Sequence, residues 1–521
     1  MSEQETLKPK IKLSRTKNAV RNIYSGMFNK IFTIFFPFLI RTVLIKKIGI
    51  EYAGLNSLFS SILQVLNLTE LGFASAVVYS MYKPIAEDDK DTICALLNFY
   101  KRVYFIIGLV ILALGTAVMP FLQHLIKGNI PQDINIYVLY SIYLVNTSLS
   151  YLLFGYKNSL LNAHQRRDVI SNILTITQGL MNICQLLILV TIKNYYLYVL
   201  MMPIFTVLNN VMVGIETKRM FPEYSCKGKL DISVKKDIRK KVAGLMISKL
   251  AQTSRNSFDS IFISAFLGLT TTAVYSNYML VFTSLTGIIN VITNSMQAGV
   301  GNFIQTERPE KNYELLKKLA LLYALLIGWC ATCMLCIYQP FIKTWLGEAF
   351  MLPFAIVIMI CAYFYLLISG HGCSLFYHGC GMWWNGKYLA VTEAVINIIG
   401  NYVFVKNFGL YGIVLATIIS TLIGSVWTLC ILFKFFFSNK KMIKFFLFEV
   451  FLAFISFVLC CLTLFINKIT VAQESFIKAI LVTGFSATVL FFAAYMLISK
   501  LLHLQIPLKI FRHKKHNREV K

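Results

Sequence analysis

Residues 476–500 read FIKAILVTGFSATVLFFAAYMLISK, an apolar run of 25 residues whose two lysines lie near its ends. A helix needs roughly 20 apolar residues to cross the hydrocarbon core of a bilayer, so this run is long enough to span one. Similar runs recur from about residue 20 onward, and the chain is 57% hydrophobic with a mean hydropathy of +0.66. A soluble core could not bury this much apolar side chain, so the sequence predicts an all-α integral membrane protein.

We expect about 14 membrane helices, and a first helix that is retained, because it is too long for a signal peptide and no small-residue cleavage site follows it. The expected spans are 20–45, 53–81, 95–119, 134–157, 169–192, 195–217, 242–268, 272–298, 314–338, 352–376, 387–405, 411–437, 445–467 and 476–500.

The net charge of the chain is +27, from 50 Lys and Arg against 23 Asp and Glu. Such an excess can indicate nucleic-acid binding, but here the basic residues follow the expected topology. Most of them fall in alternate loops and in both tails, among them residues 8–21, 218–241 and 509–521. Because basic loops stay on the cytoplasmic side, we predict that both termini are cytoplasmic and that nucleic acid is not a partner.

No motif indicates an enzyme, since the sequence has no P-loop, no Rossmann glycine pattern and no HExxH. The 12 cysteines lie largely in apolar segments, which favours buried thiols over a disulfide framework. His371, Cys373, His378 and Cys380 are zinc-binding residue types, but they lie in a short glycine-rich stretch near the membrane surface. An interfacial turn is the preferred interpretation, so neither a metal nor another cofactor is expected.

The chain contains an internal repeat. Ile48-Gly49-Ile50 followed by Gly54 matches Leu267-Gly268-Leu269 followed by Ala273, 219 residues later. A second pair, Thr177-Gln178 and Thr392-Glu393, has nearly the same spacing. These matches predict a six-helix unit used twice in the same orientation. The expected parts are an N-terminal lobe (1–217), a cytoplasmic basic linker (218–241), a C-terminal lobe (242–437) and two further helices with a basic tail (438–521).

Polar and charged residues recur on one face of four expected helices. Ionisable groups inside a membrane cost about 2.5–3.5 kcal/mol each, so they tend to face a cavity or a partner. The helical period places these residues on common faces and leaves apolar residues on the other side, which predicts a polar interior between the halves. The faces comprise Lys30, Thr33, Pro37 and Arg41; Asn56, Ser60, Gln64, Asn67 and Glu70; Lys249, Gln252, Arg255, Asn256 and Asp259; and Thr283, Thr286, Asn290, Thr293 and Asn294.

Lys249 lies 219 residues after Lys30, so the two lysines occupy equivalent places in the repeat. Two ammonium groups facing one cavity would suit a doubly charged anion such as a diphosphate. The candidate substrate-binding residues are Lys30, Arg41, Lys249, Arg255, Asn67, Asn256 and Asn290, and the candidates for coupling to H⁺ or Na⁺ are Glu70, Asp259 and Glu393.

Each of these candidates has a structural alternative. Arg255 and Asp259 are four residues apart and could neutralise each other. Arg41 and Lys30 could instead snorkel to opposite membrane surfaces. The two glutamates could be protonated partners in helix–helix hydrogen bonds, and the stripes of Ser, Thr and Asn could serve packing alone.

Three stretches resemble bacterial polysaccharide flippases, the O-antigen and capsule repeat-unit exporters of the multidrug/oligosaccharidyl-lipid/polysaccharide (MOP) superfamily. The first is the stretch from Ser57 to Ala86, which is similar to the second-helix signature of that family. The second comprises Asp259 and the residues up to Tyr278, and the third Glu393, Asn397 and the run from Gly409 to Val414. The chain departs from the family pattern at 383–387, where it has Trp-Trp-Asn-Gly-Lys.

This resemblance implies two six-helix lobes that alternate between inward- and outward-facing states in the bacterial cytoplasmic membrane. The implied cargo is an oligosaccharide on undecaprenyl diphosphate, with membrane lipids around the protein and a polysaccharide polymerase and glycosyltransferases as partners. Three alternatives remain open: a lipid II flippase, a multidrug cation antiporter of the same superfamily, and a membrane scaffold that does not transport.

Overall fold

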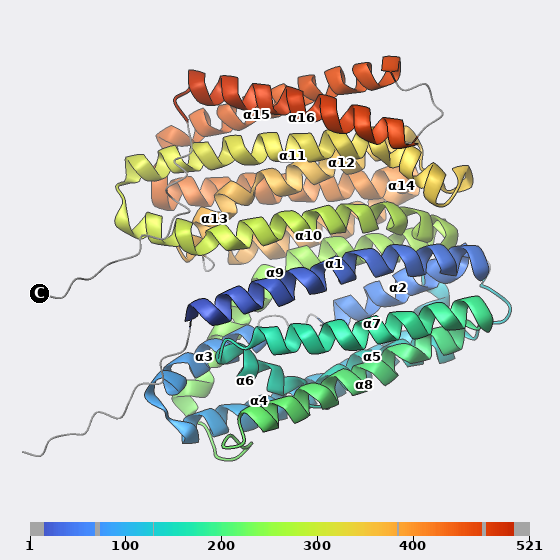
Figure 1. The fold of residues 1–521 in the computed structure, drawn as a ribbon, viewed down its shortest axis with the longest axis vertical. Coiled ribbons are helices and arrows are strands. Elements are labelled where there is room, and N and C mark those ends of the chain that lie inside the picture. Colours follow the sequence, from blue (N-terminus) through green and yellow to red (C-terminus); the bar gives the residue numbers. More distant parts are fainter. Residues whose placement is uncertain (1–14, 68–72, 129, 383–384, 471–475, 505–521) are drawn as a thin grey trace, which may run out of the picture. The chain divides into compact units, whose positions relative to one another are not determined.

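The structure is a computed structural model, and it describes residues 15–67, 73–128, 130–382, 385–470 and 476–504. Within these residues the chain is helical and contains no strand, so the predicted all-α fold is confirmed. The chain forms two compact units, Met1–Ala273 and Val274–Lys521, each of which is a bundle of helices (Figure 1). The predicted lobe boundaries at 217 and 242 stay a prediction, since compactness alone does not define a repeat.

In the first unit, α7 packs against α1 and α8, α5 packs against α4 and α8, and α2 packs against α9. Asparagine and aspartate side chains begin several of these helices: Asp89 accepts from Thr92 N, and Asn135 and Asn194 cap α5 and α8. The helices are α1 (Arg15–Lys47), α2 (Ile50–Leu66), α3 (Phe73–Glu87), α4 (Lys90–Val118), α5 (Ile136–Leu152), α6 (Asn158–Ala163), α7 (Arg167–Thr191), α8 (Tyr195–Met220) and α9 (Ile232–Leu267), with short 3₁₀ helices η2 (Met119–Leu125) and η3 (Gly155–Lys157).

In the second unit, α11 is the central helix and contacts α12, α15 and α16. The outer faces of α15 and α16 are phenylalanine-rich, as expected for helices in contact with lipid: Phe454, Phe457 and Phe485 are 63%, 65% and 74% exposed. The elements are α10 (Leu269–Thr306), which begins in the first unit, α11 (Pro309–Trp345), η4 (Glu348–Phe350), α12 (Phe354–Ser369), α13 (His371–Gly379), α14 (Lys387–Leu432), the π-helical turn η6 (Phe433–Phe437), α15 (Asn439–Thr470) and α16 (Phe476–Leu501).

Within the described residues, 10 helices are long and apolar enough to cross a membrane, with Tyr388–Phe437 counted as one helix, or 11 if the bent pair Ile136–Leu152 and Gly155–Ala163 is one span. The chain is therefore a multi-pass membrane protein. Three predicted spans differ from the structure: 53–81 corresponds to α2 and α3, with 68–72 outside the described residues, 134–157 is broken after Leu152, where α5 ends, and 352–376 is divided between α12 and α13. Helix α9 begins at Ile232, inside the predicted linker.

Helix α14 is a hairpin of two antiparallel helices, as the predicted spans 387–405 and 411–437 require. Gly409 has the non-helical angles φ 56° and ψ −131°. A Cβ added at Gly412 would lie 2.2 Å from Phe404 O, and one added at Gly400 would lie 3.0 Å from the Ala416 side chain. The two arms therefore run side by side, with small residues at their closest contacts.

The linker between α8 and α9 is held against the start of α4. Asn98 Nδ2 donates to Gly228 O at 2.9 Å, and Ser225 N donates to Cys94 Sγ at 3.3 Å. Nearby, the His164 ring packs on Phe221 at 4.3 Å between ring centroids. Burial lowers the pKa of His164, so its imidazole is neutral at pH 7.

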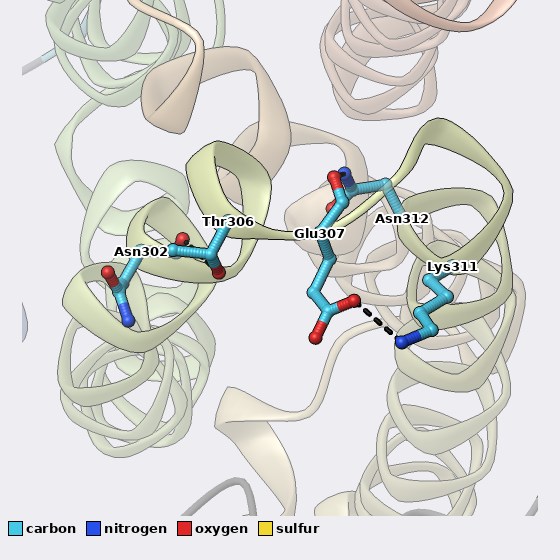
Figure 2. A network of polar contacts seen from close by, with 5 residues as sticks. All are labelled: Asn302, Thr306, Glu307, Lys311 and Asn312. Carbon is cyan, nitrogen blue, oxygen red and sulfur yellow. Dashed lines mark hydrogen bonds and ion pairs between the residues drawn. The ribbon is translucent and has the colours of Figure 1, made fainter.

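In the second unit, a small polar network lies where α10 ends and α11 begins (Figure 2). Thr306 Oγ1 donates to Asn302 O at 3.0 Å, and Asn312 Nδ2 donates to Glu307 O at 3.0 Å. Lys311 Nζ donates to the Glu307 carboxylate at 2.7 Å, but this pair is exposed and contributes little to stability. The hydrogen bond from the Asn312 side chain to the Glu307 carbonyl is the contact that fixes the turn.

The two repeated glycine motifs form the same local structure and lie against each other. Gly49 (φ 145°) separates α1 from α2, and Gly268 (φ 91°) separates α9 from α10, so both have the backbone angle that glycine tolerates best. A Cβ added at Gly54 would lie 2.3 Å from Leu269 O. The start of α2 therefore packs directly on the backbone of the second motif.

We expect Gly54→Ala to lower the melting temperature of the purified protein, because the added methyl group meets a backbone carbonyl that cannot rotate away. Overpacking of this kind costs about 1–3 kcal/mol. Gly484→Ala is the control, since a Cβ at Gly484 on α16 has nothing within 4 Å. Equal melting temperatures for the two variants would contradict the close packing of α2 on Leu269.

Candidate functional site

Helix α1 has two distinct faces within the first unit. Phe28, Ile31 and Phe35 are 55%, 64% and 61% exposed, as a lipid-facing surface requires. Lys30 and Arg41 are half-buried on the other side, together with Thr33 and Pro37. Eleven residues separate the two basic side chains, which is about 16 Å along the helix axis. Lys30 and Arg41 are therefore at different depths and cannot contact the same small group.

A narrow polar crevice lies between α1 and α7, and two residues of α1 near Lys30 in sequence, Asn29 and Thr33, line it. The crevice is lined by Asn29, Thr33, Thr175 and Gln178, among others, and has room for about one water molecule. Asn29 Nδ2 donates to Thr175 Oγ1 at 2.8 Å, which ties the two helices together. No hydrogen bond or ion pair among the described residues uses the ammonium group of Lys30. The charge is therefore available to a ligand or to water.

Arg41 joins three helices at the other end of α1. Its guanidinium donates to Ala53 O at 3.3 Å and to Ser57 Oγ at 3.4 Å on α2, and to Ala273 O at 3.1 Å on α10. Ala273 is the repeat counterpart of Gly54, so the arginine binds next to the close contact of the two glycine motifs. A planar group with five donors can hold several carbonyls at once. In this structure Arg41 is a cross-link between helices.

The polar stripe of α2 is engaged in helix packing. Asn56 Oδ1 accepts from Tyr143 Oη at 2.7 Å, and Asn67 Oδ1 accepts from Tyr151 Oη at 3.4 Å, so both contact α5. Gln64 Oε1 accepts from Ser257 Oγ of α9 at 3.1 Å. Ser60, by contrast, is exposed. Asn67, a predicted substrate-binding residue, therefore contributes to the bond between α2 and α5.

A cluster of tyrosines continues this network and was not predicted from the sequence. Tyr143 Oη and Tyr195 Oη are 3.2 Å apart, and Tyr195 Oη donates to Tyr52 O at 2.9 Å. The hydroxyls of Tyr143, Tyr195 and Tyr198 are within electrostatic range of Arg41. These tyrosines come from α5 and α8, far apart in sequence, and no local sequence pattern indicates that they meet.

The structure describes only part of the predicted site on α9. The side chains of Lys249, Arg255 and Asn256, and the whole of Glu70, lie outside the described residues. Asp259 is described and is 3% exposed. Whether Arg255 neutralises Asp259 therefore stays a prediction.

In the second unit, Glu393 is buried on the first arm of α14, 8% exposed. A Cβ added at Gly424 would lie 2.8 Å from Glu393 Oε2, so the carboxylate packs against the second arm. One turn further, Asn397 Nδ2 donates to Thr417 Oγ1 at 3.2 Å. The hairpin thus gathers a carboxylate, amides and hydroxyls in a buried layer, a set of oxygen ligands that suits a small cation.

Asn290 is half-buried on α10, one turn before a polar contact of three helices. Thr293 Oγ1 lies 2.8 Å from Tyr323 Oη and 3.1 Å from His371 Nδ1. His371, which is half-buried, therefore has a protein partner. No cluster of three or more His, Cys, Asp or Glu that could hold a metal occurs among the residues that the structure describes.

Sequence reasoning also missed Glu449 on α15. The carboxylate is half-buried at membrane depth, and Tyr365 of α12 and Cys373 of α13 are within its electrostatic range. The signal was present, because a single acidic residue interrupts the apolar run 445–467. It was overlooked because α15 lies outside the repeated part of the chain.

No protein-family model matches the sequence, and a search of curated proteins finds no match either. Solved structures do share the fold. "Lipid II flippase MurJ, inward closed conformation" has a TM-score of 0.63 and 17% identity, and the alignment covers 93% of this chain and 100% of that chain. At these identities the likeness establishes the fold, which is that of lipid flippases and multidrug transporters.

Two further structures of this fold are transporters. The MATE transporter VcmN of Vibrio cholerae has a TM-score of 0.54 and 12% identity, and the alignment covers 80% of this chain and 96% of that one. A MOP superfamily transporter from Pyrococcus furiosus, whose binding pocket is described as having reverse polarity, has a TM-score of 0.54 and 15% identity, over 81% and 98% of the two chains.

We expect Arg41→Ala to destabilise the protein, because it removes donors from Ala53 O, Ser57 Oγ and Ala273 O together. Loss of hydrogen bonds to a charged donor costs about 1.5–3 kcal/mol, measured as a lower melting temperature in detergent. Arg41→Lys keeps the charge but not the planar fork, so it should recover only part of the loss. A variant Arg41→Ala with unchanged stability and lost transport would instead assign Arg41 to substrate binding.

Proposed function

We propose that this chain is an alternating-access flippase that moves undecaprenyl-diphosphate-linked oligosaccharide repeat units across the bacterial cytoplasmic membrane, from the inner to the outer leaflet, for surface polysaccharide synthesis. The observation that carries the proposal is the fold, which a lipid II flippase shares over 93% of this chain. Transport of a lipid-linked substrate, rather than an enzymatic reaction, is the activity that this likeness supports.

The extent of the likeness favours a lipid-linked cargo over a soluble drug. The multidrug transporters align over 79–83% of the chain with TM-scores of 0.52–0.57, against 93% and 0.63 for the flippase. The two C-terminal helices α15 and α16 present long exposed apolar faces. A transporter with these two additional lipid-facing helices fits a cargo whose lipid tail stays in the bilayer during transport.

Basic residues at membrane depth supply the chemistry for a diphosphate headgroup. Lys30 is half-buried, and its ammonium group has no partner within the described part of the chain. A lysine binds phosphate as a compact point charge, and Lys249 is the equivalent residue of the second repeat. Arg255 is a further candidate, and Asn256 and Asn290 are candidates for the sugars.

The role of Arg41 is revised in this proposal. Its hydrogen bonds to Ala53 O, Ser57 Oγ and Ala273 O join α1, α2 and α10, so we propose that it acts through the conformation of the protein. Asn67 likewise acts through the conformation of the protein, by its hydrogen bond to Tyr151 of α5. The substrate-binding candidates with the clearest chemical role are the two lysines.

Carboxylates inside the membrane are candidates for energy coupling. Glu393 is buried against Gly424 on the second arm of α14, and Asp259 is buried on α9. Either group could exchange a proton or a sodium ion during the transport cycle, as could Glu70. We also propose that both termini are cytoplasmic and that the protein acts together with glycosyltransferases and a polymerase.

A lipid II flippase is the second candidate, because the flippase structure that shares the fold carries that name. The two cargoes have the same diphosphate and polyprenyl tail and differ in the sugars. Removal of the protein distinguishes them: accumulation of a lipid-linked oligosaccharide other than lipid II supports the first proposal, and accumulation of lipid II with cell lysis supports the second.

Replacement of Lys30 and Lys249 together by Ala should abolish surface glycan, because both point charges for the diphosphate are lost. The glycan is measured on intact cells by immunoblotting or by its mass, and the amount of protein in the membrane is measured alongside. Lys468→Ala, at an exposed end of α15, is the matched control and should leave the glycan unchanged. Normal glycan in the double variant would disprove the role of the lysine pair.

A further inference from the structure

The first unit contains a second candidate site, far from Lys30. An open cavity of about 460 Å³ lies where α1 turns into α2, at the end of the unit opposite the basic linker. The α1–α2 turn, the loop after η2 and the α9–α10 turn line it. Its volume is within the range of about 300–1,000 Å³ typical of sites for small molecules. The residues that matter are Glu51, Tyr52, Lys127, Gln132, Gly268 and Thr270.

The walls of this cavity are held in place by contacts between the three segments. Lys127 N donates to Ser264 O at 3.0 Å, and a Cβ at Gly268 would lie 2.9 Å from Lys127 O, so the loop rests on the α9–α10 turn. Tyr52 Oη donates to Asp133 Oδ1 at 2.5 Å and ties the same loop to α2. The cavity is therefore preformed.

Apart from Tyr52, whose hydroxyl is bonded to Asp133, the polar side chains that line the cavity have no protein partner among the described residues. Among the described residues, no hydrogen bond or ion pair engages the side chains of Glu51, Lys127, Gln132 or Thr270. The polar stripe of α2 differs in this respect, because Asn56, Gln64 and Asn67 are hydrogen-bonded to neighbouring helices. The free donors and acceptors of the cavity are available to a ligand.

The composition of the lining selects a neutral, hydroxyl-rich ligand. One carboxylate and one ammonium group face the same space, so the cavity favours neither a cation nor an anion. A sugar hydroxyl can donate to Glu51 and accept from Lys127, and the amide of Gln132 and the hydroxyl of Thr270 can do both. Hydrogen bonds in which one partner is charged are stronger than hydrogen bonds between two neutral groups.

We propose that this cavity binds a saccharide unit of the transported glycan on the exit side of the membrane. The inference rests on the proposed function, because the topology expected from the basic loops places this end of the unit outside. A site of this kind would retain the sugars while the diphosphate is still bound within the membrane. It would also favour release of the cargo into the outer leaflet over its return.

Saturation-transfer NMR on the full-length protein in nanodiscs tests the proposal. The probe is the free oligosaccharide released by mild acid from the lipid-linked intermediates of the producing cells, so it carries neither diphosphate nor lipid. Glu51→Gln and Lys127→Met should each weaken its binding about tenfold, and the double variant should abolish the signal. Gln132→Ala should weaken binding, whereas Gln123→Ala, an exposed glutamine of η2, is the matched control and should not.

The inference would be overturned by the absence of a signal from the wild-type protein, or by a signal that the Glu51 and Lys127 variants retain. Displacement of the sugar by a lower concentration of phosphoethanolamine would assign the cavity to a zwitterionic headgroup and would also overturn it. The proposed function fails differently, if cells without the protein still translocate the lipid-linked glycan. The probe therefore tests the cavity, and the cellular measurement tests the transport.

Discussion

A polar group inside a membrane must find its hydrogen-bond partner within the protein, and much of this structure follows from that constraint. Arg41 meets it by donating to two backbone carbonyls and a serine on neighbouring helices. Tyr143 meets it through Asn56 and Tyr195. Because these bonds join helices that are distant in sequence, they fix the arrangement of the first unit as well as satisfying individual groups.

The fold could be predicted because its two main signals are strong in the sequence. Long apolar runs determine the helices, and glycines determine several of the breaks between them. Gly268 and Gly409 both have positive φ at a predicted boundary. The break after α5 could not be predicted in the same way, because it occurs at Phe154. The φ angle of Phe154 is 47°, which residues other than glycine rarely adopt. Tertiary contacts hold that break, including the bond from Lys157 Nζ to Gly214 O at 3.0 Å.

The candidate site was predictable only in part, for a physical reason. Helical periodicity shows which residues share a face, but not whether that face meets a cavity or another helix. Thus Asn67 and Lys30 looked alike in the sequence, although the amide is bonded to Tyr151 and the ammonium group is available. The cavity beside Glu51 and Lys127 gave no sequence signal, since three loops that are far apart in the chain supply ordinary polar residues to it.

The central claim is that this chain carries a diphosphate-linked lipid, and reconstitution tests it most directly. The measurement is the rate at which undecaprenyl-diphosphate-linked oligosaccharide moves from the inner to the outer leaflet of liposomes containing the purified protein, detected by an impermeant glycan-specific lectin. We expect movement that depends on the protein and that is inhibited by undecaprenyl-diphosphate without sugars, which competes for the same site. No movement above protein-free liposomes, together with export of a cationic dye by the same preparation, would contradict the account.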